Sequence, residues 1–128
     1  MIIARGFRGF VTIALVLIIV SACTARYSGG TGEPNDPYQI ATAIDLITLG
    51  ETPEDYDKHF KLTADLDVDP NLPGCKVFNK AAIASTRSPW GGFTGVLDGN
   101  YHRIVNIRIE ALVNNYTAGF IGSLSRSA

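Results

Sequence analysis

Residues Phe93–Ile109 contain two strand-like runs on either side of a turn, and this segment constrains the fold most strongly. The sequence Asp98–Asn100 is Asp-Gly-Asn, which is typical of a turn. After the turn, Ile104 and Ile107 are three positions apart, so strict alternation breaks and we expect a bend or bulge near Asn106. Before the turn, one face of the predicted strand carries Phe93, Gly95 and Leu97.

Two further segments have the composition of strands. Phe60–Val68 alternates strictly between apolar and polar residues, as a half-buried strand does, and Gly119–Leu124 favours another short strand. Residues 75–92 show no clear pattern. Short strands separated by Gly, Asn and Asp turns predict a mainly β fold, the start of a stacked β-solenoid. Such a fold needs about three stacked units, so we expect exposed strand edges at its C-terminal end.

A helical cap is predicted before the strands. Thr42 and Asp45 have the spacing of a capping box, apolar residues follow at helical spacing, and Gly50 is expected at the C′ position. Thr52 and Pro53 then resemble a second N-cap and first turn, predicting a short helix that reaches about residue 58. Two short helices at this place would cover the open end of a solenoid.

The amino terminus has the pattern of an export signal. Arg5 and Arg8 precede the apolar run Val11–Val20, which is shorter than the roughly 20 residues that span a bilayer. We therefore predict a signal helix in residues 1–22, a flexible linker of Gly, Ser and Pro in residues 23–37, and the cap with the first coils in residues 38–128.

Val20–Cys23 resembles the lipobox of bacterial lipoproteins, which makes Cys23 a lipidation candidate. Simple cleavage after Ala22 is the alternative, because Val20 and Ala22 also suit an ordinary signal peptidase. With lipid on Cys23, Cys75 has no disulfide partner; without it, a Cys23–Cys75 bridge becomes available in an oxidising compartment. The lipobox resemblance, with Thr24 after the cysteine, implies the outer membrane.

The charge balance argues against nucleic-acid binding. The whole chain has a formal charge of −1, and removing residues 1–22 takes away Arg5 and Arg8 but no acid, which leaves −3. Phosphate binding requires clustered Lys and Arg, and the nearest such pair is Lys76 with Lys80. We therefore expect no nucleic-acid partner.

Several polar residues have spacings that catalytic or metal-binding groups can have, but none is assigned such a role. Asp98 with His102 could form an acid–base pair, but a turn and stacking role is favoured. Asp65, Asp67 and Asp69 have calcium-loop spacing without the Gly and Glu that an EF-hand requires. A solvated strand face is favoured for Asp65 and Asp67, and a looser oxygen-ligand site is the alternative. A lone Cys75 with a distant histidine is a weak nucleophile pattern. We expect no catalytic residue, cofactor or metal.

Other residues have surface interpretations. Asn115–Thr117 fits a glycosylation sequon, which has no use in a chain with a bacterial-type signal. An aromatic sugar platform could be formed by Trp90, Tyr101 and Tyr116, although such residues more often pack partly inside.

Gly119–Leu124 (Gly-Phe-Ile-Gly-Ser-Leu) resembles the start of the GLUG repeat found in bacterial exported proteins. Asp36–Ile40, Phe60–Asp67 and the segment from Phe93 to Asn106 are similar, in that order, to the regions that precede the repeat. The resemblance covers most of residues 29–124 and implies a right-handed parallel β-helix on a surface protein, adhesin-like in some members and attached to peptidases in others. The chain departs from the family by ending near the first repeat, so we expect a truncated or fragmentary product.

These patterns lead to one main functional hypothesis and two alternatives. The main hypothesis is a surface-exposed or envelope-anchored, non-enzymatic β-solenoid module for adhesion or cell-envelope interaction. Its expected partners are the membrane, through the lipid anchor, and surface glycans or proteins, with an outer-membrane or extracellular location. The alternatives are the amino-terminal fragment of a β-helix carbohydrate-active enzyme such as a polysaccharide lyase, and a gene remnant that does not fold alone.

Overall fold

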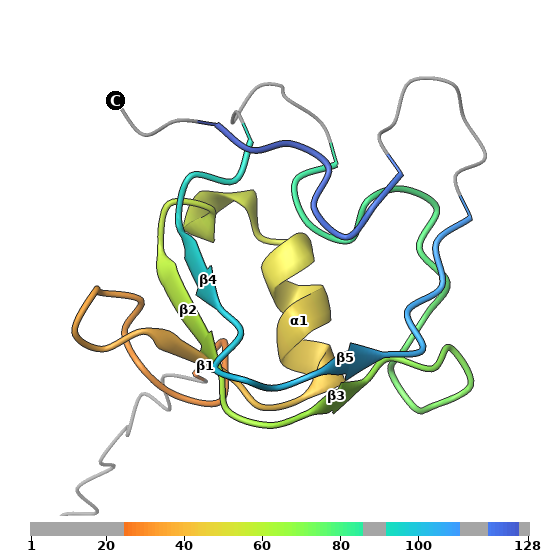
Figure 1. The fold of residues 1–128 in the computed structure, drawn as a ribbon, viewed down its shortest axis with the longest axis horizontal. Coiled ribbons are helices and arrows are strands. Elements are labelled where there is room, and N and C mark those ends of the chain that lie inside the picture. The colour runs from red at the N-terminus through yellow and green to blue at the C-terminus, as the bar shows by residue number, and fades with distance from the viewer. Residues whose placement is uncertain (1–24, 86–91, 111–117, 126–128) are drawn as a thin grey trace, which may run out of the picture.

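The computed structural model describes residues 25–85, 92–110 and 118–125 (Figure 1). Strands predominate over helix in this part of the chain, so the fold is mainly β as predicted. None of its helices has the length and apolar character needed to cross a membrane. In chain order the elements are β1 (Tyr38–Ile40), α1 (Ala43–Gly50), the 3-10 turn η1 (Pro53–Asp55), β2 (His59–Leu62), β3 (Leu66–Asp67), β4 (Val96–Asp98) and β5 (Ile104–Val105).

All pairings between the named strands are parallel. One sheet has the order β1-β2-β4 and the other pairs β3 with β5. Three isolated parallel bridges continue the same arrangement, Phe78 with Ile109, Ile83 with Ile121 and Phe93 with Leu124. The chain therefore passes twice over the same path. We call residues 59–93 the inner pass and residues 96–124 the outer pass.

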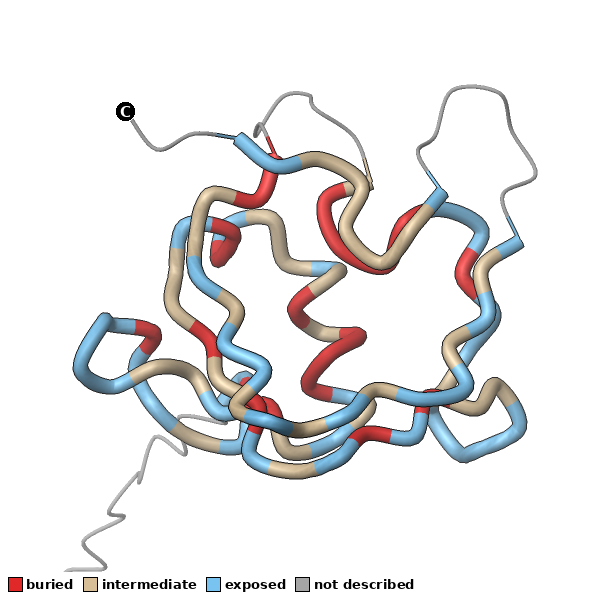
Figure 2. Tube along the Cα trace, viewed as in Figure 1, coloured by how far each residue is buried: buried red, intermediate tan, exposed pale blue. Residues whose placement is uncertain are grey.

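The core lies inside this path, with α1 visible within its outline in Figure 1. Phe60 on β2 is fully buried at the centre, and α1 contributes Leu46 and Leu49. Figure 2 shows buried residues along α1 and at intervals along the strands. The alternation of apolar residues in the sequence thus specifies which side chains enter the core.

Phe60–Val68 does not form the single strand that its alternation predicts. Phe60, Leu62, Leu66 and Val68 are all buried, but the chain turns a corner between β2 and β3. At the corner the Thr63 amide donates to the Ile40 carbonyl at 3.0 Å. The predicted alternation of buried and exposed side chains is confirmed. The prediction of one continuous strand is wrong, because β2 and β3 belong to different sheets.

The capping box of α1 is confirmed. The Asp45 amide donates to Thr42 Oγ1 at 3.1 Å, and Asp45 Oδ2 accepts from the Thr42 amide at 3.0 Å. Gly50 is the last helical residue, and Glu51 occupies the C-cap position, so the C′ prediction for Gly50 is wrong. A glycine is needed at position 50 because the backbone of Ala82 lies very close to it: a Cβ on residue 50 would be 2.0 Å from the Ala82 carbonyl oxygen.

The second predicted helix is only the 3-10 turn η1. Thr52 makes no N-cap hydrogen bond; its hydroxyl instead donates to the Thr48 carbonyl of α1 at 2.7 Å. The Thr52 side chain therefore bonds to α1 and does not cap η1. η1 ends at Asp55 and β2 begins at His59, so no helix reaches residue 58.

Residues 27–32 are part of the packed body, so the flexible linker predicted for residues 23–37 is wrong over this stretch. Tyr27 is buried in the core, with its ring 4.6 Å from that of Tyr38. Gly30 has φ +80°, and a Cβ there would lie 1.9 Å from the Pro37 carbonyl oxygen. The glycine thus allows a tight return of the chain, a role that composition alone cannot distinguish from flexibility.

In the outer pass, the bend predicted near Asn106 is confirmed, because Asn106 adopts φ +60°. The strand predicted at Gly119–Leu124 is wrong as a continuous element: Ile121 and Leu124 each form one isolated bridge. The unassigned residues 75–92 contribute Phe78 and Ile83, which pair with the outer pass in the same way.

Candidate functional site

Asp98 and His102 do not form the acid–base pair considered from the sequence. Asp98 Oδ1 accepts the Asn100 amide at 2.9 Å, which closes the Asp-Gly-Asn turn. Asn100 and Tyr101 in this turn both adopt positive φ. His102 Nδ1 lies 3.1 Å from Asp65 Oδ1 in the inner pass. The structural role favoured for Asp98 is therefore observed, while the partner of His102 is a different acid.

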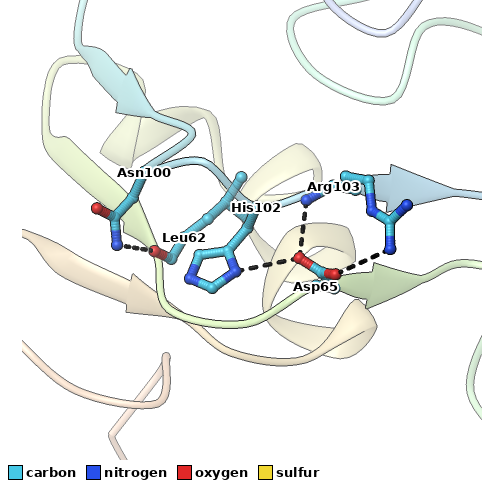
Figure 3. Close-up of polar contacts among 5 residues, drawn as sticks. All are labelled: Leu62, Asp65, Asn100, His102 and Arg103. Atoms are coloured by element: carbon cyan, nitrogen blue, oxygen red, sulfur yellow. Dashed lines mark hydrogen bonds and ion pairs between the residues drawn. The ribbon is translucent and has the colours of Figure 1, made fainter.

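Figure 3 shows the polar cluster that joins the two passes, which we call the turn clasp (Asp65, Asn100, His102 and Arg103). Asp65 Oδ1 accepts the Arg103 amide at 3.0 Å, and Asp65 Oδ2 lies 3.5 Å from the Arg103 guanidinium. Asn100 Nδ2 donates to the Leu62 carbonyl at 3.1 Å. Each bond connects the β2–β3 corner with the segment between β4 and β5, so the clasp aligns the corners of successive passes.

The electrostatics of the clasp favour ionised Asp65. The backbone hydrogen bond from Arg103 is the largest influence that lowers the pKa of Asp65, and the hydrogen bond to His102 lowers it further. The Asp65 side chain is 54% exposed, so solvent screens these interactions. An ionised carboxylate that already accepts hydrogen bonds is poorly suited to donate a proton near neutral pH. The arrangement supports a structural rather than an acid-catalytic role.

The lowered pKa of Asp65 predicts a pH-dependent contribution to stability. Since the folded-state pKa lies below the ordinary value, the contribution is present above that value and is lost as pH falls through the folded pKa. We expect Asp65→Asn to lower the melting temperature at about pH 7 and to lose this effect as pH falls below about 4. Thermal melts across this range would measure it. Asp57→Asn removes an exposed acid outside the clasp and serves as the control; an equal effect of both substitutions would contradict the prediction.

Asp67 also bonds to the outer pass. Its Oδ1 accepts from Asn106 Nδ2 at 2.8 Å, while Asp69 bonds locally to Asn71. Asp65 and Asp67 are both exposed, as the predicted solvated face requires, and they also bond to the outer pass. Each acid precedes its partner by nearly the spacing that separates the paired strands, so these contacts can be anticipated only once the register between the passes is known. Within the described ranges, no group of three His, Cys, Asp or Glu side chains could hold a metal ion.

The remaining sequence candidates are only partly described. Cys75 is half-buried with a free thiol in the part of the chain that the structure describes. Tyr101 is completely exposed. Cys23, Trp90, Tyr116 and the Asn115–Thr117 sequon lie outside the described residues, so the lipid anchor, the Cys23–Cys75 alternative and the aromatic platform stay predictions.

An open depression of about 490 Å³ lies beside β3 and the Asn106 bend, between Asp69, Asn71, Val77, Ile107 and Arg108. Its polar side chains are engaged with protein neighbours: Asp69 with Asn71, and Arg108 with Glu110. These contacts leave the depression without a convergent set of polar groups for a specific ligand.

Comparison with known proteins gives one similarity. No family model matches the chain and no solved structure matches it. The chain is 32% identical over 108 residues to halomucin of Haloquadratum walsbyi (strain DSM 16790 / HBSQ001), an alignment that covers 81% of this chain. The same alignment covers 1% of halomucin, so the chain spans a very small part of that protein's length.

Proposed function

We propose that this chain is an exported, surface-exposed or envelope-anchored module without enzymatic activity, built as the start of a right-handed parallel β-helix. The observation that carries the proposal is the parallel register between successive passes. Tyr38 pairs with Phe60, and Phe60 pairs in turn with Leu97. One position is thus stacked three layers deep in a single sheet, which is the arrangement that a solenoid repeats.

The right-handed path follows from general stereochemistry. Successive β1, β2 and β4 run parallel in one sheet, so the chain must cross over between them. Crossovers between parallel strands are right-handed in about 98% of cases. The resemblance of Gly119–Leu124 to the GLUG repeat implies the same handedness, and we propose that this segment is the start of such a repeat.

The start of the stack has the features of a cap. The Ser28 amide donates to the Gln39 carbonyl at 3.1 Å, and the Gln39 amide donates to the Gly29 carbonyl at 2.8 Å. These bonds occupy the side of β1 that faces away from β2. Leu46 and Leu49 of α1 supply apolar cover for the core. We infer that residues 27–50 close the amino-terminal end of the solenoid.

The polar chemistry of the molecule supports a structural module. In the turn clasp, the carboxylate of Asp65 at the β2–β3 corner bonds to the imidazole of His102 and to the amide and guanidinium of Arg103 in the outer pass. The same groups therefore align successive passes. A surface role, in adhesion or in contact with envelope glycans or proteins, agrees with the halomucin similarity and with the export-signal pattern of residues 1–22.

Anchoring is proposed at Cys23, at the end of the lipobox-like Val20–Cys23. We expect the wild-type protein to be recovered with membranes and to carry a lipid-modified amino terminus, whereas Cys23→Ala should be released as an exported soluble form. Covalent lipid adds about 0.8 kcal/mol of membrane affinity per buried methylene, so its loss is enough to change the fraction. Fractionation with intact-mass measurement would check this prediction.

Cys75→Ala is the matched control, because it removes the other cysteine and leaves the lipobox intact. It should fractionate with the wild type. A membrane-free wild type whose mature amino terminus carries no lipid would contradict anchoring at Cys23.

The adhesion hypothesis requires a separate measurement. We expect cells with the wild-type chain on their surface to attach to immobilised envelope glycans or proteins more than cells that lack it. Cells producing Cys23→Ala should fall to the level of the lacking strain, because the module leaves the surface. Equal attachment by all three strains would contradict the adhesion role while leaving the anchoring result unaffected.

A further inference from the structure

Among the residues that the structure describes, the outer pass has an edge without a strand partner. β4 lies at one end of the β1-β2-β4 order, and β5 pairs only with β3. The edge continues through the three bridge positions of the outer pass. Five of the positions that pair with the inner pass have a buried inner-pass partner, and we call these five the open edge: Leu97, Ile104, Ile109, Ile121 and Leu124.

Backbone geometry shows which way this edge points. Phe78 donates its amide to the Arg108 carbonyl at 2.9 Å, and its carbonyl accepts the Glu110 amide at 2.7 Å. In a parallel ladder a residue directs its N–H and C=O to the same side. Ile109, between these two partners, therefore directs both of its groups away from the inner pass.

The same pattern recurs around the pass. Ile83 bonds to Phe120 and Gly122, which flank Ile121. Phe93 bonds to Ser123 and Ser125, which flank Leu124, and Leu66 donates to Arg103, next to Ile104. On β4 the Val96 amide points to Lys58 of the inner pass, so the next residue, Leu97, points outward. All five open-edge positions thus direct donors and acceptors toward a further layer.

Side-chain burial agrees with this direction. The inner-pass partners are almost completely buried, with exposures of 0% for Phe60, 2% for Leu66, 6% for Phe78, 0% for Ile83 and 3% for Phe93. Their outer-pass partners are only half-buried, and Leu124 is 72% exposed. The stacked apolar side chains therefore continue from the inner pass into the outer pass, where they are partly exposed to solvent. None of the five carries the Lys or Pro that commonly protects an edge from pairing.

From this geometry we propose that the open edge pairs with the open edge of a second copy of this chain. At the opposite end of the stack, Ser28 and Gly29 already occupy the outer side of β1, so this strand does not supply a free edge. Edge-to-edge contact between identical surfaces generates a closed two-fold dimer with antiparallel pairing, in which each copy supplies matching donors, acceptors and apolar residues. This inference is independent of the proposed export and adhesion.

Leu124→Lys tests the proposal with little risk to the fold, because Leu124 is largely exposed in one copy. The purified full chain, kept in mild detergent so that residues 11–20 do not associate, would be measured by light scattering over a concentration series. We expect a dimer whose dissociation constant rises at least tenfold in Leu124→Lys, about 1.4 kcal/mol. Leu72→Lys is the matched control: Leu72 is an exposed leucine that is not one of the open-edge positions, and its replacement should leave the constant unchanged.

Amide hydrogen exchange at low and high protein concentration identifies the surface that pairs. Protection of the Leu97, Ile104 and Ile109 amides should increase with concentration in the wild type and not in Leu124→Lys. A chain that stays monomeric would overturn the proposal. So would a dimer that Leu72→Lys weakens equally, or edge amides whose protection is independent of concentration.

Discussion

Phe60→Ala is expected to lower the free energy of unfolding by about 3–5 kcal/mol, which is a large effect for a single substitution. Phe60 is fully buried on β2, the middle strand of the three-stranded sheet. Its removal takes away apolar burial and also leaves a cavity at the point where three layers of the stack meet.

Aromatic packing explains why this cavity would not close easily. The Phe60 ring lies 5.4 Å from that of Tyr27, 5.5 Å from that of Tyr38 and 6.2 Å from that of Phe93. These rings come from the segment before β1, from β1 itself and from the end of the inner pass. Truncating Phe60 therefore weakens the attachment of residues before β1 together with the sheet.

Chemical denaturation followed by circular dichroism would measure the effect. Since single domains are stabilised by about 5–15 kcal/mol in total, the substitution is large enough to leave a detectable unfolded population. Phe60→Leu should cost clearly less, because most of the volume is kept. Tyr101→Ala, at a completely exposed aromatic, should have almost no effect. A loss for Phe60→Ala no greater than that for Tyr101→Ala would contradict the packing described.

Features set by near neighbours in the chain were predictable from the sequence. The capping box of Thr42 and Asp45 depends on residues three apart, and the bend at Asn106 appeared as a break in apolar spacing. The buried residues of Phe60–Val68 followed from alternation alone. In each case the controlling interaction is local or depends on one periodic face.

Features that depend on register between passes were not predictable. The partner of His102 is Asp65, 37 positions earlier, because the whole intervening loop determines which corners coincide. The local sequence offered only Asp98 as a partner for His102, as the less favoured alternative to a turn and stacking role. The packing of Tyr27 was missed for the same reason: its neighbours belong to β1 and β2, whereas the glycines around it look like a linker. The missed contacts are those in which tertiary packing overrides local composition.

Asp45→Ala is the second substitution expected to have a large effect, about 2–4 kcal/mol. Asp45 is buried, and one of its oxygens, Oδ2, accepts three hydrogen bonds. The donors are the Ala41 amide at 2.9 Å, the Thr42 amide at 3.0 Å and the Ser28 hydroxyl at 2.6 Å. Alanine would leave all three without this acceptor at the start of α1.

Asp45 does more than cap a helix. Its bond to Ser28 fixes the segment that covers the outer side of β1, so its loss should weaken both the helix and the closed end of the stack. A helix N-cap alone contributes about 1 kcal/mol, and the excess over this value would measure the second role. Ser28→Ala should remove only part of the effect. A double-mutant cycle between Ser28 and Asp45 should therefore give a clear coupling energy.

The control for Asp45→Ala is Asp57→Ala, which removes the same charge from an exposed side chain whose nearest cation, Lys58 Nζ, is 3.9 Å away. Denaturation of both variants separates the loss of hydrogen bonds from the change in net charge. If the two variants unfold at the same denaturant concentration, or if Ser28 and Asp45 show no coupling, the carboxylate does not join the cap to the helix. A large Asp45 effect with strong coupling would identify the Ser28–Asp45 hydrogen bond as the contact that holds the amino-terminal end of the stack closed. In the part of the chain that the structure describes, the outer pass is then the end whose edge lacks a strand partner.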